Sequence, residues 1–181
     1  MRCGIAQALA AVVLASSGCL QAADAPFLRR QVADVKPQPD DLTANAKAAS
    51  YKPLFGIGDK DAEQLKGVVR YGELTVGPAG TSALVSYPAE EQIYFIEEGN
   101  GALLYGDQTA PVKKNDFMYL PVGVRHGIAN RSDAPVRVIV MGYRIPPEAQ
   151  VPPTPKLMLA TSMTCSFRSW DSTAPPPNSS C

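Results

Sequence analysis

The sequence predicts an all-β fold of the jelly-roll class, and three observations lead to it. From Gly67 onward, short runs rich in Val, Ile, Tyr and Phe are separated by glycine and proline every 8 to 12 residues or so, the spacing of antiparallel sandwiches and barrels. Gly99-Asn100-Gly101 and Gly106-Asp107 supply residues that tolerate positive φ in hairpin turns. After Ile145, a proline-rich stretch cannot continue a sheet interior. A single double-sheet barrel over residues 67–145 follows.

Eight short strands account for this texture. We expect them at 68–76, 82–88, 92–98, 102–106, 110–114, 116–121, 125–130 and 136–145. In such a barrel alternate residues of each strand face the interior, so side chains two apart share a face.

The segments before and after the barrel are predicted to be an N-terminal arm, residues 24–66, and a proline-rich, disordered C-terminal tail, residues 146–181. The arm mixes prolines, charges and short apolar anchors without sustained periodicity, and we expect an extended chain with one short helix around 41–49. Because the chain has 181 residues, it fits one domain of ordinary size.

The first 23 residues have the features of a signal peptide. Arg2 precedes an apolar run over 5–14, and small residues near Ala22 and Ala23 form a cleavage zone. We therefore expect an exported, periplasmic or secreted protein without a transmembrane segment. Lipoprotein anchoring at Cys19 is the alternative. In an oxidising compartment Cys165 and Cys181 could close a loop in the tail.

Charge composition argues against a nucleic-acid partner. The chain has 17 Lys and Arg against 17 Asp and Glu, so it has no net basic field that would attract a polyanion.

The stretch NDFMYLPVGVRHGIAN, residues 115–130, contains the most informative motif. Pro121 and Gly123 form a tight turn, and His126 follows on the returning strand, where it can face the barrel interior. This spacing resembles the second signature of the cupin superfamily, with Asn115 in place of the usual glycine. The matching positions are Asp116, Pro121, Gly123, His126 and Asn130. The resemblance implies a jelly-roll barrel of the RmlC-like type and nominates His126 as a metal ligand.

The first cupin signature is incomplete in VSYPAEEQIYFIEEGNG, residues 85–101. Counting back from Gly99 places Gln92 where the resemblance implies a glutamate, and the two histidine positions fall within 85–88. His126 is the only histidine of the chain. Since transition metals take several imidazole, carboxylate or thiolate donors, an amide and a hydroxyl make a poor set, and we expect no cofactor. If one is bound, a divalent Fe, Mn, Ni or Zn ion held by His126 and Glu91 is the candidate.

Several side chains are candidates for the barrel lumen. Alternation from Gln92 predicts that Tyr94 and Ile96 also point inward, and Glu91 outward unless a bulge intervenes. The ligand-binding candidates are His126, Gln92, Tyr94, Tyr87 and Ser86. Such a lumen could hold a small organic ligand, and the alternative is a filled core in which His126 bonds to Gln92 or Tyr87.

Two functions remain open from the sequence. The first is a noncatalytic or small-molecule-binding barrel with a degenerate metal site. The second is a metal-dependent cupin enzyme of the dioxygenase, isomerase or lyase type, with His126 and a nearby carboxylate. Open sheet edges and the docking arm also predict a homodimer.

The last stretch, TSMTCSFRSWDSTAPPPNSSC, differs in texture from the rest. Shifting its reading frame, with permitted codon choices, gives a peptide that alternates apolar and polar residues as a strand does. We therefore keep the hypothesis that a frameshift produced the end of this sequence. The resemblance to cupins would then imply that the chain corresponds to the N-terminal half of a bicupin.

Overall fold

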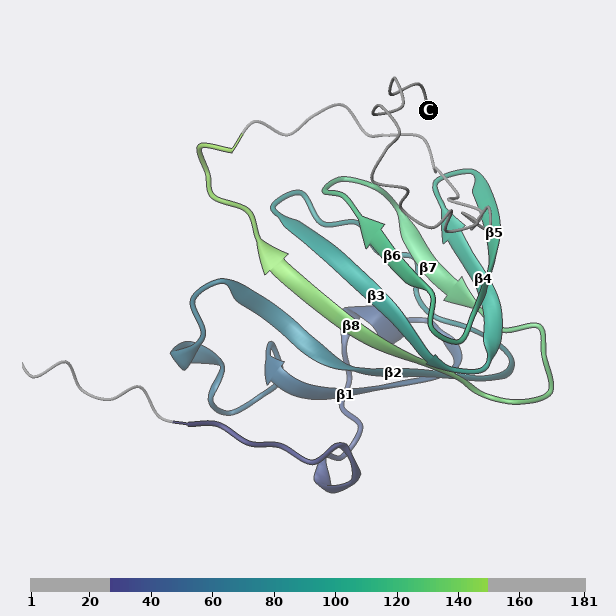
Figure 1. The fold of residues 1–181 in the computed structure, drawn as a ribbon, viewed down its shortest axis with the longest axis horizontal. Coiled ribbons are helices and arrows are strands. Elements are labelled where there is room, and N and C mark those ends of the chain that lie inside the picture. The colour runs from purple at the N-terminus through teal and green to yellow at the C-terminus, as the bar shows by residue number, and fades with distance from the viewer. Residues whose placement is uncertain (1–26, 150–181) are drawn as a thin grey trace, which may run out of the picture.

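The computed structural model describes residues 27–149, which form an antiparallel β structure (Figure 1). Three single-turn 3₁₀ helices accompany the strands: η1 (Val32–Asp34), η2 (Asp41–Thr43) and η3 (Ala62–Gln64). The strands are β1 (Lys47–Gly56), β2 (Val68–Thr81), β3 (Glu90–Glu98), β4 (Asn100–Tyr105), β5 (Gln108–Lys113), β6 (Phe117–Leu120), β7 (His126–Ala129) and β8 (Val136–Arg144).

The strands pair in the order β5-β4-β7-β2-β8-β3-β6, and β1 is added on β2. Figure 1 shows this sheet curling on itself, with β1, β2, β8 and β3 side by side in one wall and β4, β5 and β7 in the other. The walls are joined where Thr81 of β2 pairs with Ala129 of β7. The all-β jelly-roll prediction is confirmed.

Strand alternation places the core between the two walls. Along β3 and β8 every second residue is buried, as expected when one face packs against the interior. Gln92, Tyr94 and Ile96 therefore point inward together, as predicted. The core side chains with no exposed surface are Leu42, Tyr51, Leu74, Val76, Tyr94, Ile96, Ala110, Ile128, Val136, Val138 and Val140.

Two sequence expectations differ from the structure. The predicted strand at 82–88 is reduced to an isolated bridge between Val85 and His126, because Pro88 has no N–H to donate and cannot extend a ladder. The short helix expected around 41–49 is limited to the single turn η2, which ends at Thr43, because positive φ values at Asn45 and Ala48 break any helical continuation.

The arm contributes a strand to the barrel that was not predicted. β1 pairs antiparallel with β2 from Lys47 to Gly56, so the sheet starts about twenty residues before Gly67, where the barrel was expected to begin. Pro53 is tolerated because β1 lies at the margin of the sheet and its register shifts between Pro53 and Phe55. The arm thus packs against its own chain. A strand exchanged with a second chain is not needed to cover β2.

The predicted signal peptide, Cys19, the Cys165 and Cys181 pair and most of the predicted tail lie outside the described residues. None of the helices between residues 27 and 149 has the length and apolar character required to span a bilayer.

Candidate functional site

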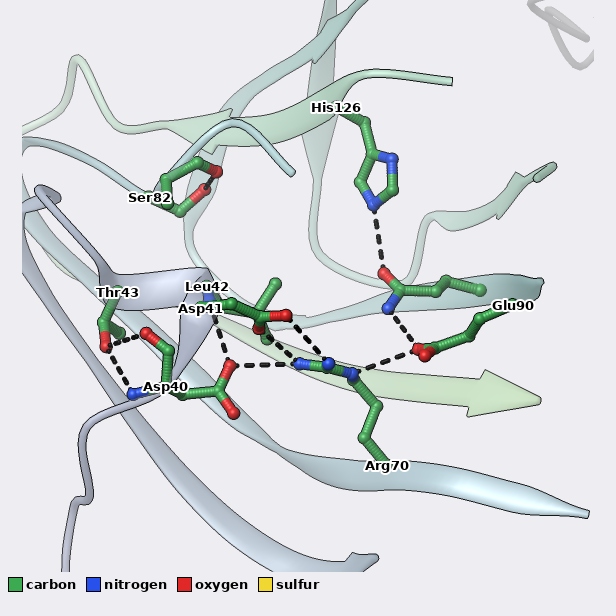
Figure 2. Close-up of polar contacts among 10 residues, drawn as sticks. Asp40, Asp41, Leu42, Thr43, Arg70, Ser82, Glu90 and His126 are labelled. Atoms are coloured by element: carbon green, nitrogen blue, oxygen red, sulfur yellow. Dashed lines mark hydrogen bonds and ion pairs between the residues drawn. The ribbon is translucent and has the colours of Figure 1, made fainter. Parts of the chain in front are cut away.

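A chain of buried polar side chains runs through the interior of the barrel and starts at His126 (Figure 2). His126 lies on β7 and is 1% exposed. Its Nδ1 is 2.9 Å from the carbonyl oxygen of Val124, and its Nε2 is 3.0 Å from Oε1 of Gln92. Gln92 is one of the two partners expected for this histidine from the sequence.

Gln92 connects the histidine to a buried carboxylate. Its side chain has no exposed surface, and its Nε2 donates to Oε1 of Glu90 at 2.7 Å. Since Glu90 and Gln92 are two residues apart on β3, they share its inward face. The amide therefore has a fixed orientation, with nitrogen toward the carboxylate and oxygen toward the imidazole.

Arg70 of β2 is the centre of the polar chain. It is 2% exposed, and its Nε donates to the same oxygen of Glu90 at 3.0 Å. On the other side, Nη1 donates to Asp41 at 2.7 Å and to Asp40 at 3.0 Å, and Nη2 donates to Asp41 at 3.0 Å. Figure 2 shows the resulting path from His126 to the aspartates of η2. One guanidinium thus joins the arm, β2 and β3.

Local structure holds the two aspartates in place. Asp40 is the N-cap of η2: its side chain accepts from the backbone N–H of Leu42 at 2.9 Å, and Thr43 completes a capping box. Leu42 is fully buried in the core. The short helix is therefore anchored by an apolar side chain while its carboxylates face Arg70.

A glycine makes room for this cluster. Gly142 of β8 lies opposite Arg70 in the sheet, and a Cβ at this position would be 2.2 Å from Oε1 of Glu90 and 2.7 Å from Cγ of Arg70. Any larger residue would displace the ion pair. The requirement for glycine here comes from the close approach of these side chains.

Three tyrosines surround the polar chain. The guanidinium of Arg70 lies 4.7 Å from the ring centroid of Tyr87, and the Tyr94 and His126 rings meet edge to face at 5.5 Å. Within residues 27–149, the buried hydroxyls of Tyr51 and Tyr94 have no hydrogen-bond partner, whereas the hydroxyl of Tyr87 interacts with the carboxylate of Asp41. Burial raises the pKa of all three, so they stay protonated and present O–H donors.

When His126 is protonated, both of its ring nitrogens carry a hydrogen, and neither has a lone pair left to accept a hydrogen bond or bind a metal ion. Both ring nitrogens face carbonyl oxygens, which only accept, so the imidazolium satisfies both contacts and a neutral ring only one. Burial lowers the pKa of His126, and the Val124 carbonyl opposes this shift. If the side-chain amide of Gln92 were flipped, its nitrogen would donate to a neutral His126 ring. Its oxygen would then face the carboxylate of Glu90, which cannot donate.

The residues present do not fit a metal ion. Nε2 of His126 is directed at an amide, a weak ligand, and the nearest inward carboxylate, Glu90, is bound to Arg70. In the part of the chain that the structure describes, no group of three or more His, Cys, Asp or Glu side chains could hold a metal.

Two predicted site residues lie away from the lumen. Ser86 is exposed, since alternation turns it outward between the inward-facing Val85 and Tyr87, and its prediction as a lumen residue is wrong. Glu91 lies on the outer face of β3, where it accepts from the hydroxyl of Tyr119 at 2.9 Å. The register of β3 has no shift near Glu91 that would rotate it inward. The structure therefore does not bring Glu91 together with His126.

The sequence analysis missed Arg70, Asp40 and Asp41, which are hydrogen-bonded members of the polar chain, and Tyr51, which lies beside it. A signal was present for the first. Arg70 shares a strand face with Leu74 and Val76, so alternation alone would have placed a charge among core residues. The contact with Asp40 and Asp41, about thirty residues away, carries no local signal.

Comparison with known proteins identifies the fold family of this site. A family model described as a cupin domain matches residues 72–142. These residues are a cupin domain. An uncharacterized protein of Methanocaldococcus jannaschii is 31% identical over 79 residues, which are 43% of this chain and 63% of that protein. The matched segment thus spans just under two thirds of this relative.

Solved structures share the cupin fold at low sequence identity. A predicted oxalate decarboxylase from Thermotoga maritima superposes with a TM-score of 0.56 and 18% identity, over 65% of this chain and all of the other. The polyketide cyclase RemF from Streptomyces resistomycificus gives 0.54 and 21%, over 75% and 89%. These two proteins are named for different reactions, so the likeness establishes the cupin fold alone.

The carboxylates of Asp40 and Asp41 predict a pH dependence of stability. Burial raises the pKa of Asp40 to about 6. For Asp41, hydrogen bonds to Asp40 and Arg70 outweigh burial and lower the pKa to about 2. A raised native pKa stabilises the fold below about pH 4, and this contribution is lost as the pH rises through about 6. Urea unfolding of Asp40→Asn between pH 4 and 7 should lack this loss.

Asp41→Asn is the matched control, because its effect has the opposite sign. A lowered native pKa adds stability above about pH 4 that disappears as the pH falls toward 2. The free energy of unfolding of this variant should therefore be lower than that of wild type at neutral pH. Identical pH profiles for the two variants would contradict the assignment.

Proposed function

We propose that this cupin domain is a noncatalytic, metal-independent barrel that binds a small neutral organic molecule carrying oxygen acceptors. The observation that carries the proposal is the pair of buried, unpartnered tyrosine hydroxyls of Tyr51 and Tyr94 beside the polar chain. Leaving one buried donor unpaired costs about 1–3 kcal/mol, and native proteins seldom leave several together. A ligand with carbonyl, ether or hydroxyl oxygens would satisfy them.

The charge of the lumen supports a neutral ligand. Arg70 is already paired with Glu90, Asp40 and Asp41, so the guanidinium offers no unopposed positive charge for an anion. These carboxylates are in turn engaged by Arg70, and an additional charge of either sign is costly to bury unless it is paired. The side chains that remain free to recognise a molecule are neutral O–H donors on aromatic rings, set among aliphatic residues.

The alternative function, a metal-dependent cupin enzyme, finds less support in the same geometry. Its chemistry would need an open coordination position and several strong donors, whereas His126 is engaged on both nitrogens. We therefore do not assign to this protein the reactions for which the predicted oxalate decarboxylase and the polyketide cyclase are named.

Removal of one hydroxyl tests the proposal. Tyr94→Phe should unfold with a free energy equal to or about 1–2 kcal/mol above wild type, because the lost hydroxyl has no hydrogen-bond partner among the described residues. In ligand-observed NMR against a set of small neutral ketones, lactones and amides, wild type should bind at least one compound, and the variant should bind it about tenfold more weakly.

Tyr143→Phe is the matched control, since it makes the same chemical change on the outer side of β8, away from the lumen. It should leave binding unchanged. Equal binding by Tyr94→Phe and wild type, or the absence of any bound compound, would contradict the proposal.

We further propose that the protein acts outside the cytoplasm, and that its leader is removed near Ala22 or Ala23. The support is the charge and apolar pattern of residues 1–23. Amino-terminal sequencing of the protein produced in a Gram-negative host should find a start at about residue 23 or 24. A chain that retains Met1, or one that begins at a lipid-modified Cys19, would contradict this cleavage.

A further inference from the structure

The hydroxyls that would contact a ligand are closed off from solvent. Tyr51 and Tyr94 have no exposed surface, so a molecule reaches them only after some segment of the chain has moved aside. Both tyrosines lie on strands of one wall, in which β1 pairs with β2, β2 with β8 and β8 with β3. Separating these strands would break many backbone hydrogen bonds at once. The moving part is therefore a segment outside this wall.

Residues 39–46, which include η2, form a loop that is fastened at both ends; we call it the η2 strap. Before the strap, the backbone N–H of Gln38 donates to the carbonyl oxygen of Tyr51 at 2.9 Å. After it, Lys47 begins β1 and pairs with Thr81 of β2. The strap therefore leaves the sheet and soon returns to it, as a compact surface loop does. Its displacement would leave both fastening points intact.

The strap itself is held mainly by side chains. In the described part of the chain, a single backbone hydrogen bond joins it to another segment, from the N–H of Ala83 to the carbonyl oxygen of Leu42 at 2.8 Å. Its side-chain attachments include the buried Leu42 and the carboxylates of Asp40 and Asp41 on Arg70 (Figure 2). Segments with few backbone hydrogen bonds to their surroundings open locally, at a lower free energy than global unfolding.

Backbone strain marks the C-terminal end of the strap as its hinge. Asn45 has a φ of 58°, and Ala48, just after the strap, has a φ of 52°. Residues other than glycine occupy this left-handed region at a cost, and alanine has no side-chain hydrogen bond to offset it. The register of β1 also shifts between Lys47 and Ala49. Displacement of the strap allows the strained residues to relax, which favours opening.

The strap lies beside the two unpartnered hydroxyls. Leu42 belongs to the same apolar cluster as Tyr51 and Tyr94. Burial raises the pKa of both tyrosines, and the negative charge of Asp41 acts in the same direction, so this carboxylate is near both hydroxyls. Movement of the strap would carry Leu42 and Asp41 away together and give access to the tyrosines.

We propose that the η2 strap is a gate that opens to admit the ligand to Tyr51 and Tyr94, and that the contact between Arg70 and Asp41 is its latch. This inference rests on the proposed function and adds the route of entry. Asp41 binds the guanidinium at 2.7 and 3.0 Å, yet its side chain is 46% exposed. Water takes over this carboxylate when the strap moves, while Glu90 stays on Nε of Arg70, so opening leaves no buried charge without a partner.

Native-state hydrogen exchange of the full chain tests the opening without any ligand. The amide of Ala83, which is bonded to Leu42, should exchange through a local opening whose rate is insensitive to low urea. The slowest amides of β2 and β8 should exchange through global unfolding instead, with a steep dependence on urea. The same steep dependence at Ala83 would mean that the strap opens only when the protein unfolds, and would overturn the gate.

Asp41→Asn tests the latch through binding kinetics. The amide loses the charge-assisted bonds to Arg70, so the strap opens more often. For a compound that binds wild type, the association and dissociation rate constants should both rise about tenfold, because the ligand enters and leaves through the same opening. Asp59→Asn is the matched control: its carboxylate also accepts from an arginine, Arg30 at 3.1 Å, but lies outside the strap. It should keep the rate constants of wild type.

Equal rate constants for Asp41→Asn and wild type, or an equal rise in Asp59→Asn, would overturn the gate. Circular dichroism checks the fold of each variant. If Asp41→Asn does not fold, Thr43→Val replaces it with the same expected direction, since it removes the capping-box hydroxyl of η2 and leaves Arg70 untouched. If no compound binds wild type, the proposed function fails and the role of the gate fails with it. Binding together with steep urea dependence at Ala83 overturns the gate alone.

Discussion

The buried guanidinium of Arg70 is the constraint on which the rest of the interior depends. A charge with 2% exposure must be matched by hydrogen-bonded partners, and here they come from η2 on one side and β3 on the other. Removing one partner from a buried ion pair typically costs about 3–5 kcal/mol. The single cluster therefore couples the docking of the N-terminal arm to the order of the lumen.

The same charge decides what the lumen can hold. Arg70 orients Glu90, Glu90 orients the amide of Gln92, and the amide oxygen then faces the imidazole of His126. Each of these side chains is hydrogen-bonded to the next. His126, which the second cupin motif nominates as a metal ligand, therefore has no open coordination position beside it. The guanidinium of Arg70 thus organises the polar side chains of this interior through Glu90 and Gln92.

The fold was largely predictable because strand alternation and turn residues are local signals. Seven of the eight expected strands form, and His126 meets Gln92, one of the two partners expected for it in a filled core. β1 was missed because Pro53 and the charges around it hide an edge strand whose stability comes from pairing with β2. The ion cluster was missed for the same reason: Asp41 and Arg70 meet only after the arm has packed, and nothing near either residue encodes their contact.

The central claim, that a side-chain cation rather than a metal organises this lumen, is tested most directly by elemental analysis of the purified protein. The full chain would be incubated in turn with Fe(II), Mn(II), Ni(II) and Zn(II), freed of unbound metal, and compared with His126→Gln. The account predicts a metal content far below one ion per chain in both proteins. About one ion per chain in wild type, lost in the His126 variant, would contradict it.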